Sequence, residues 1–177
     1  LRGSDLLKQL EDQHSDDVGT VDDPFTGNNW LVLKPLNPDV AVVQVQAADE
    51  EGNAWIMGPR WDNTEQCKAS KRTIIITEKI VSTEVIRQQP ENTVIPGLFV
   101  SHVVEQPFGA FPTSVYRAYD YDAAHIEKYV EASSTQEDFN RYLDEYIYST
   151  SDYWEFLEKI GGLKRLNHLI ADPVFGY

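Results

Sequence analysis

The chain has 177 residues, 41% of them hydrophobic, and a formal net charge of −14. This length and composition are typical of one domain with a real core. The charge argues against nucleic acid as a partner, because nucleic-acid phosphates bind to basic surfaces. No apolar run comes near the roughly 18 residues that span a membrane, so no membrane partner is expected.

Two further features bear on where the protein works. The first residue is Leu1 rather than Met and no signal peptide is visible, so we expect a piece of a longer polypeptide. The single cysteine, Cys67, excludes an internal disulfide and a cysteine-based metal cluster. A lone cysteine favours a reducing compartment, and we expect the cytoplasm.

The first part of the chain predicts one helix and two strands. Residues 4–11 place three leucines on one side, as the end of an amphipathic helix does, and residues 13–27 are polar and loop-like. Residues 30–33 predict a short strand. Residues 40–48 are the strongest strand, because a continuous apolar start is followed by alternation of apolar and polar residues.

The middle of the chain predicts short strands that alternate with short helices. Gly52 lies in a turn after the first long strand, where glycine can adopt a positive φ. The elements expected next are an extended piece at residues 55–57, a helix over residues 62–69, a β-branched strand at residues 73–77, a helical turn over residues 82–87 and a valine-rich strand at residues 98–104.

Residues 107–114 follow the last of these strands and do not fit a regular element. They contain two prolines, each of which fixes φ and removes a backbone donor. Ligands gather beyond the carboxyl ends of strands in open α/β sheets, which makes this loop the best candidate site. The alternative is a structural connection packed by its own aromatic residues, and the residues alone leave both interpretations open.

After Asp122 the pattern becomes helical. A capping box, Ser134-x-x-Glu137, opens the second helix of this part. The helices are expected over residues 122–132, 135–148, 152–160 and 163–170. The predicted fold class is therefore α/β. A partial open sheet with short helices over residues 1–122 precedes a helical tail over residues 123–177, all within a single unit that resembles the second half of a larger domain.

Self-contained catalytic motifs are absent from the sequence. There is no G-x-G-x-x-G, P-loop, H-E-x-x-H or G-x-S-x-G. Asp120, Asp122, His125 and Glu127 bring metal-type ligands close together in sequence. Asp122 as the N-cap of a helix is the simpler interpretation of that cluster.

Two glutamates, Glu78 and Glu105, lie at the carboxyl ends of predicted strands. A carboxylate there can act as a base, as a nucleophile or as a structural acceptor for loop amides, and spacing alone favours the structural role. Asp49 and Asn53 likewise fit a turn in which side chains bind the turn's own backbone.

Several segments, taken in order, resemble the α subunit of family I CoA-transferases. The segments shared with the family are DVA at 39–41, ADxxGNA at 48–54, TIIIT at 73–77, EKIV at 78–81, IPG at 95–97 and VVE at 103–105. Those closest to the glutaconate CoA-transferase branch are DPFTG at 23–27, GAFPTS at 109–114 and YDYD at 119–122. The resemblance covers most of the chain, including the helical tail.

The resemblance also implies what this chain lacks. Family α subunits have an N-terminal half with a Gly-Gly-Phe loop, which is absent here, so the chain resembles the C-terminal half. The catalytic glutamate of the family lies in a Glu-Asn-Gly-type motif of the partner β subunit. Neither Glu78 nor Glu105 matches that motif, so no catalytic residue is expected in this chain, and no metal ligand either.

The activity implied by the resemblance is ping-pong transfer of CoA from an acyl-CoA to a carboxylic acid. A CoA thioester is then a substrate, and no permanently bound cofactor is expected. The rings of the loop would supply apolar walls, and its hydroxyls and the glycine and alanine amides would supply donors to a carboxylate. The residues expected to bind substrate are Phe108, Gly109, Ala110, Phe111, Thr113 and Ser114.

The expected partners are a β subunit, an acyl-CoA and a small carboxylic acid, within a hetero-oligomer. Two other functions stay open at this point. One is a CoA-thioester hydrolase of the same superfamily that lacks the transferase glutamate, and the other is a non-catalytic assembly domain.

Overall fold

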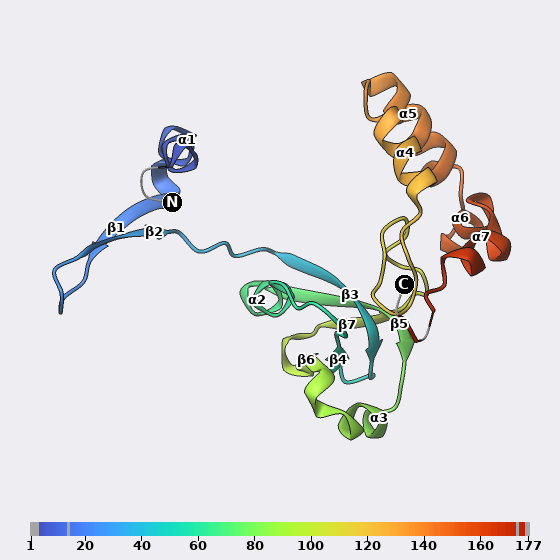
Figure 1. The fold of residues 1–177 in the computed structure, drawn as a ribbon, viewed down its shortest axis with the longest axis horizontal. Helices are drawn as coiled ribbons and strands as arrows, with labels where there is room; N and C mark the ends of the chain where they lie inside the picture. Colours follow the sequence, from blue (N-terminus) through green and yellow to red (C-terminus); the bar gives the residue numbers. More distant parts are fainter. Residues whose placement is uncertain (1–3, 14, 173, 176–177) are drawn as a thin grey trace. The chain divides into compact units, whose positions relative to one another are not determined.

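The computed structural model describes residues 4–13, 15–172 and 174–175. The contacts within the chain gather in two units, residues 1–37 and residues 38–177 (Figure 1). Each unit has its own sheet. The sequence predicts a single unit over residues 1–177, and this stays a prediction.

The first unit consists of a helix and a β-hairpin. α1 (Asp5–Gln13) precedes a short 3-10 turn, and β1 (Val18–Asp22) pairs antiparallel with β2 (Asn29–Leu33). The predicted helix and the predicted strand at residues 30–33 are confirmed. The predicted loop over residues 13–27 is wrong for β1, because the β-branched residues of β1 pair with β2.

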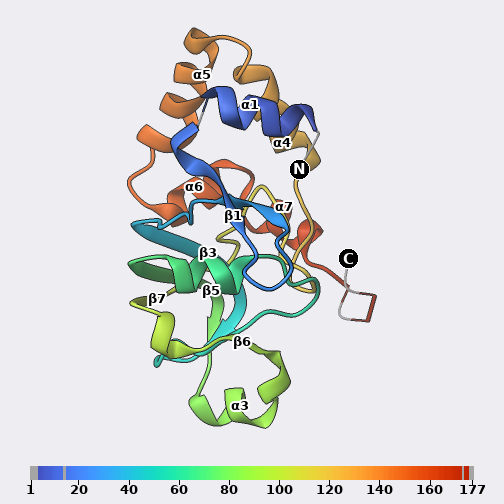
Figure 2. The same cartoon turned by 90° about the vertical axis from the view of Figure 1, so that its left-hand side faces the viewer.

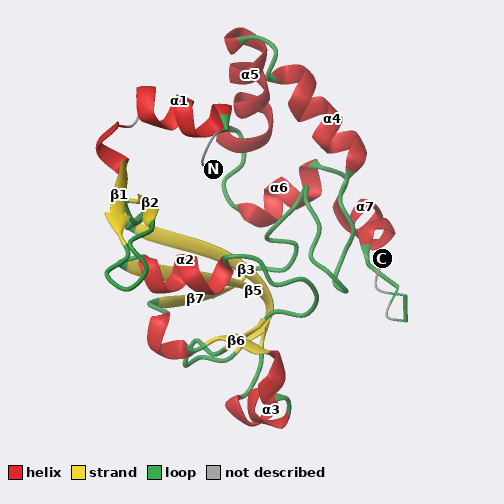
Figure 3. Ribbon diagram, turned by 60° about the vertical axis from the view of Figure 1, so that its left-hand side comes forward, coloured by secondary structure: helices red, strands yellow, loops and turns green. Residues whose placement is uncertain are grey.

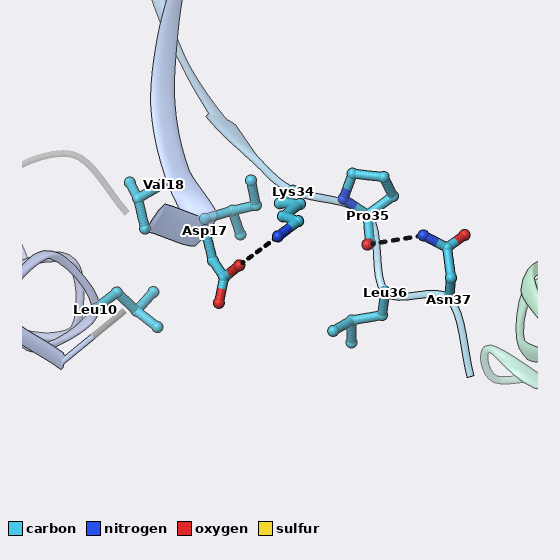
Figure 4. Close-up of a pocket in the computed structure, with 8 residues that line it drawn as sticks. Leu10, Asp17, Val18, Lys34, Pro35, Leu36 and Asn37 are labelled. Carbon is cyan, nitrogen blue, oxygen red and sulfur yellow. Dashed lines mark hydrogen bonds and ion pairs between the residues drawn. The ribbon is translucent and has the colours of Figure 1, made fainter. Parts of the chain in front are cut away.

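The hairpin leaves apolar side chains exposed. No side chain that the structure describes in the first unit is buried, and Leu36 is 85% exposed. A hollow of about 600 Å³ is lined by Leu10, Val18 and Leu33, and Lys34 Nζ lies 3.5 Å from a carboxylate oxygen of Asp17 beside it (Figure 4). Such exposed side chains contribute little hydrophobic stabilisation to the unit itself.

The second unit is built on an open five-stranded sheet. Its strands, in spatial order, are β6 (Thr93–Ile95), β4 (Ala54–Trp55), β3 (Val40–Ala48), β5 (Arg72–Ile80) and β7 (His102–Glu105). β3, β5 and β7 run parallel, whereas β4 and β6 pair antiparallel with their neighbours. The predicted α/β class with a partial open sheet is confirmed.

One face of this sheet carries the core. The side chains of β3 and β5 alternate, so that Val43, Val45 and Ile75 are buried on the same face, at 3% exposure or less. α2 (Asn63–Ala69) lies along this face and adds the buried Cys67 (Figure 3). The β-branched residues of β5 therefore pack as the sequence predicts, although the strand is longer than residues 73–77.

The turn after β3 is held by its own side chains, as the sequence predicts. The buried Asp49 carboxylate accepts hydrogen bonds from the backbone amide of Asn53 at 2.8 Å and from its side-chain amide at 2.9 Å. The Asn53 side-chain oxygen then accepts a hydrogen bond from the Gly97 amide at 3.0 Å. The GNA and IPG segments are therefore joined to each other, and their role in this structure is structural.

The predicted strand at residues 98–104 is only partly correct. A 3-10 turn occupies Gly97–Phe99, and β7 begins at His102. The Phe99 and Val100 amides donate to Pro96 and Gly97, which holds this part of the apolar run in a turn. Local turn hydrogen bonds therefore outweigh β-propensity there.

Short helices make up the rest of the second unit. They are α3 (Thr83–Gln88), α4 (Ala123–Ala132), α5 (Gln136–Leu143) with a π-helical continuation (Asp144–Tyr148), α6 (Tyr153–Lys159) and α7 (Gly162–Leu169) (Figure 2). The predicted cap at Ser134 is off by one residue, because Thr135 accepts the hydrogen bond from the Asp138 amide. Within the described ranges, no helix is long and apolar enough to cross a membrane.

Candidate functional site

The loop predicted as the site lies directly on the sheet face opposite the core. A Cβ placed on Gly109 would lie 2.7 Å from Gln44 Oε1 and 2.8 Å from Ile76 Cγ2. Both side chains alternate with the buried residues of their strands, so they belong to this second face. The backbone at Gly109 approaches the sheet so closely that a side chain does not fit.

Glu78 attaches the loop to β5. One carboxylate oxygen accepts a hydrogen bond from Gln44 Nε2 at 2.5 Å, and the other accepts one from the Phe108 amide at 2.7 Å. Burial raises the pKa of Glu78 above its ordinary value, while the hydrogen bonds from Phe108, Tyr119 and Gln44 lower it. The structure therefore gives Glu78 the structural role that the sequence favours.

Two tyrosines hold the loop from its other side. The Tyr119 hydroxyl accepts a hydrogen bond from the Ala110 amide at 2.9 Å, and its ring lies 4.8 Å from that of Phe108. The Tyr153 hydroxyl, on α6, donates to the Phe108 carbonyl at 2.5 Å. Burial raises the pKa of Tyr119 and raises that of Tyr153 to about 12, so both phenols stay protonated at neutral pH.

Phe108 adopts a backbone conformation that is costly for a bulky residue. Its φ is 60°, in the left-handed region that favours glycine. Such a conformation persists where the surroundings over-determine it. Here Glu78 holds the amide, Tyr153 holds the carbonyl and Tyr119 packs on the ring.

The exposed end of the loop carries two hydroxyls, Thr113 and Ser114. Thr113 Oγ1 donates to the Ala110 carbonyl at 2.6 Å. The Gly109 amide donates to the Gln106 carbonyl, and the Ala110 amide donates to Tyr119. Donation from these two amides to a substrate stays a prediction, and in this conformation both have partners within the chain.

The second aromatic residue of the loop faces the helical tail. The Phe111 ring contacts His125 and Phe156 edge-on, at centroid distances of 5.1 and 5.9 Å. Phe108 and Phe111 therefore lie against different neighbours, and both are partly buried. The loop is packed by its own aromatic residues, as the structural interpretation requires, while its hydroxyls remain exposed.

The acidic cluster before α4 is a helix cap. The buried Asp122 accepts a hydrogen bond from the His125 amide at 3.0 Å and pairs with Arg165, whose Nε lies 2.7 Å from a carboxylate oxygen. The Arg165 guanidinium lowers the pKa of Asp122. Among the residues that the structure describes, no group of three or more His, Cys, Asp or Glu side chains is arranged to hold a metal.

Of the residues that hold the loop, Glu78 was singled out from the sequence, whereas Gln44, Tyr119 and Tyr153 were not. Gln44 is a polar interruption in an apolar strand, and that interruption is the signal that could have identified it. Tyr119 is part of the YDYD segment but carried no sign of its role. Tyr153 comes from a helix about 45 residues further along the chain, and only tertiary packing brings it to Phe108.

Glu105 accepts a hydrogen bond from the Ile80 amide at 2.6 Å, which is the structural role predicted for it.

His125 gives a testable pH dependence. Burial holds its pKa below the ordinary 6.5, so the unfolded chain binds a proton more readily than the folded chain. Its contribution to stability is therefore complete above the unfolded pKa and is lost as pH falls through the folded pKa. We expect the free energy of unfolding to fall as the pH is lowered below about 6.5, by at most about 1.4 kcal/mol per pH unit from this group.

Urea unfolding at several pH values measures this slope. His125→Phe keeps a ring among the aromatic neighbours and is expected to flatten the slope. His168→Gln, at an exposed position on α7, serves as the matched control and should leave the slope unchanged. Equal slopes in the wild type and in His125→Phe would contradict this account.

The chain is similar to known proteins of one family. Residues 12–106 match the family model described as "Coenzyme A transferase". One of the subunits of the glutaconate CoA-transferase of Acidaminococcus fermentans is 34% identical over 174 residues, which covers 98% of this chain and 54% of that protein. The corresponding subunit of the 3-oxoadipate CoA-transferase of Pseudomonas knackmussii is 30% identical, and the match covers 89% of this chain and 54% of that protein.

A solved structure of a CoA-transferase also matches this chain. The crystal structure of glutaconate coenzyme A-transferase from Acidaminococcus fermentans matches with a TM-score of 0.89 and 34% identity, over 100% of this chain and 59% of that chain. The chain thus spans about half the length of the curated relatives it matches. The family model covers more than half of the present sequence. The chain belongs to the coenzyme A transferase family.

Proposed function

We propose that this chain is the C-terminal part of the α subunit of a CoA-transferase, which moves CoA between an acyl-CoA and a carboxylic acid in the cytoplasm. The observation that carries the proposal is the similarity to glutaconate CoA-transferase along the whole chain at 34% identity. A partner β subunit supplies the catalytic glutamate, and the two subunits form a hetero-oligomer. In agreement with this, Glu78 and Glu105 are both engaged by backbone amides of this chain.

The reaction follows from the chemistry of the partner's glutamate. Its carboxylate oxygen attacks the thioester carbon and the CoA thiolate leaves, which gives an acyl–glutamyl anhydride. The thiolate then attacks the glutamyl carbonyl, which releases the free acid and leaves a glutamyl-CoA thioester. A second carboxylate repeats these steps in reverse and departs as the new acyl-CoA. Covalent catalysis of this kind divides one difficult step into easier ones.

We propose a dicarboxylic acid as the substrate class. The names of two relatives, a glutaconate and a 3-oxoadipate CoA-transferase, both refer to dicarboxylic acids. In this proposal, the loop at residues 107–114 lines the acid-binding side of the site. Phe108, Gly109, Ala110 and Phe111 fix its shape, and Thr113 and Ser114 present hydroxyls to a carboxylate.

Replacing both hydroxyls tests this role. Thr113→Ala/Ser114→Ala in the complete enzyme is expected to lower kcat/KM for the acid about 10- to 100-fold for each hydroxyl that binds it, because a hydrogen bond to a charged group contributes about 1.5–3 kcal/mol. Steady-state kinetics with varied acid concentration measures the effect. Ser134→Ala, an exposed serine between α4 and α5, is the matched control. Unchanged turnover and KM in the double variant would refute a substrate-binding role for the hydroxyls.

The two alternative functions give different products in the same assay. A CoA-thioester hydrolase of the superfamily releases free CoA and places none on the added acid. A non-catalytic assembly domain leaves the thioester intact whatever its partner. A Glu-Asn-Gly motif in the β subunit supports transfer, and its absence supports hydrolysis.

A further inference from the structure

The loop at residues 107–114 is attached to the fold in both of its halves, the second through the hydrogen bond from the Asp122 amide to the Pro112 carbonyl. Its first half makes a hydrogen bond to the sheet through the Phe108 amide, one to α6 through the Phe108 carbonyl and one to Tyr119 through the Ala110 amide. Thr113, at the exposed end, is bonded back to the Ala110 carbonyl. The position of the Thr113 hydroxyl is therefore tied to that of Ala110, and Ser114 is the next residue along the chain.

Glu78 is the acceptor that fixes the start of this segment. Its carboxylate is partly buried, and in the part of the chain that the structure describes it forms no ion pair. Its partners are neutral donors, namely the Phe108 amide, the Gln44 side-chain amide and the Tyr119 hydroxyl. Burial of a carboxylate without a cation is unfavourable, so an apolar residue would fill this place at lower cost if packing were the only requirement.

The geometry argues against Glu78 as a general base. Each of its two oxygens accepts a hydrogen bond from this chain, one from Gln44 and one from the Phe108 amide. The Gln44 carbonyl oxygen is buried and, among the described residues, has no hydrogen-bond partner. The orientation of the Gln44 amide is therefore set by Glu78 on one side and by the close backbone of Gly109 on the other.

We propose that Glu78 is a positioning residue: by accepting the hydrogen bond from the Phe108 amide, it holds the loop at residues 107–114 in the conformation that presents Thr113 and Ser114 to the acid substrate. This inference rests on the proposed function for its catalytic consequence. The positioning itself concerns only contacts within this chain. The positioning of the loop and its effect on catalysis are therefore tested by different measurements.

Two variants of equal size separate positioning from chemistry. Glu78→Leu keeps the volume and removes the acceptor, and replacing a buried charge by an apolar residue is often neutral or stabilising, so the variant should fold. Glu78→Gln keeps an acceptor for the Phe108 amide, and its NH₂ can donate to the unpaired Gln44 oxygen after that amide turns over. Glu105→Leu, which loses the bond to the Ile80 amide on the same sheet, is the matched control.

The first measurement is hydrogen exchange at the Phe108 and Ala110 amides in the full-length chain with its partner. Glu78→Leu is expected to raise exchange at both amides about tenfold or more, since loss of one buried hydrogen bond makes local opening easier. Glu78→Gln and Glu105→Leu should retain protection there. Unchanged exchange in Glu78→Leu would overturn the proposal even if the complex proves to have no transferase activity.

The second measurement is kcat/KM for the acid in the complete enzyme. Glu78→Leu is expected to lower it about 10- to 100-fold, as small misplacements in a site commonly do, and Glu78→Gln should restore it to within about threefold of the wild type. Loss of activity in Glu78→Gln equal to that in Glu78→Leu, with exchange still protected, would assign Glu78 to the chemistry and overturn the positioning role. If the wild type shows no CoA transfer, the proposed function fails and the exchange result still decides the inference.

Discussion

Gly97→Ala is expected to lower the free energy of unfolding of the second unit by about 3 kcal/mol, at the upper end of what overpacking costs. An added Cβ would lie 2.2 Å from the Glu51 carbonyl oxygen and 3.3 Å from the Asn53 amide nitrogen. These are backbone atoms, and the hydrogen bonds between Asp49 and Asn53 hold them in place. The clash therefore cannot be relieved by turning a flexible side chain.

Urea unfolding of the full-length chain measures the effect, with an unchanged m-value as the sign that only stability has changed. Leu98→Ala is the matched control, since Leu98 is the next residue and is 79% exposed. It should alter stability by no more than about 0.5 kcal/mol. Equal unfolding midpoints for Gly97→Ala and Leu98→Ala would show that Gly97 is not packed against the turn at residues 49–53 as described.

Gly109→Ala is expected to lower kcat/KM of the complete enzyme about 100-fold or more, because catalysis falls steeply when a binding loop is displaced. The added methyl would meet Gln44 Oε1 at 2.7 Å, Ile76 Cγ2 at 2.8 Å and the Gln106 carbonyl oxygen at 2.9 Å. The loop must then lift from the sheet. The hydrogen bond from the Phe108 amide to Glu78 would lengthen as it does so.

The decrease in the free energy of unfolding should be smaller than the increase in the activation free energy that corresponds to the lower kcat/KM. The reason is that the core lies on the opposite face of the sheet. Kinetics and unfolding of the same variant measure the two effects. Gly19→Ala is a control with the same chemical change, since its Cβ would make an ordinary 3.6 Å contact with Val32. Full activity in Gly109→Ala would show that the loop's close contact with the sheet has no part in the site.

The α/β class and most elements of the second unit could be predicted from the sequence. In β3, the alternation of apolar and polar residues matches the alternation of burial, and the run of β-branched residues located β5. The starts of α4 and α6 carry residues that do cap, since Asp122 and Asp152 accept hydrogen bonds from amides three residues ahead. Local patterns suffice where one element's own side chains decide its structure.

The errors arose where pairing or turns outweigh local preference. β1 (Val18–Asp22) is short, contains a glycine and lies within a polar stretch, and its pairing with β2 reveals it. The run at residues 98–104 has strand-like composition, but hydrogen bonds from Phe99 and Val100 hold its first part in a turn. Strand propensity depends on neighbours that the sequence alone does not display.

The location of the candidate site could be predicted, and its supporting contacts could not. The loop follows the carboxyl end of β7, which is where the general rule for open sheets directs attention. The hydrogen bonds that hold the loop join residues far apart along the chain. Tyr153 is 45 positions from Phe108, Glu78 is 30 positions from Phe108, and Tyr119 is 9 positions from Ala110. Spacing left Glu78 with three possible roles, and the hydrogen bond from the Phe108 amide supports the structural one.

The most direct test of the proposed function is CoA transfer by the complete enzyme, meaning the full-length chain with its β subunit. An acyl-CoA is supplied with an isotopically labelled dicarboxylic acid, and the products are separated and identified by mass. The account predicts labelled dicarboxylyl-CoA and parallel double-reciprocal lines, the kinetic sign of a covalent enzyme intermediate. Consumption of the thioester with free CoA as the product and no label in any CoA ester would contradict it.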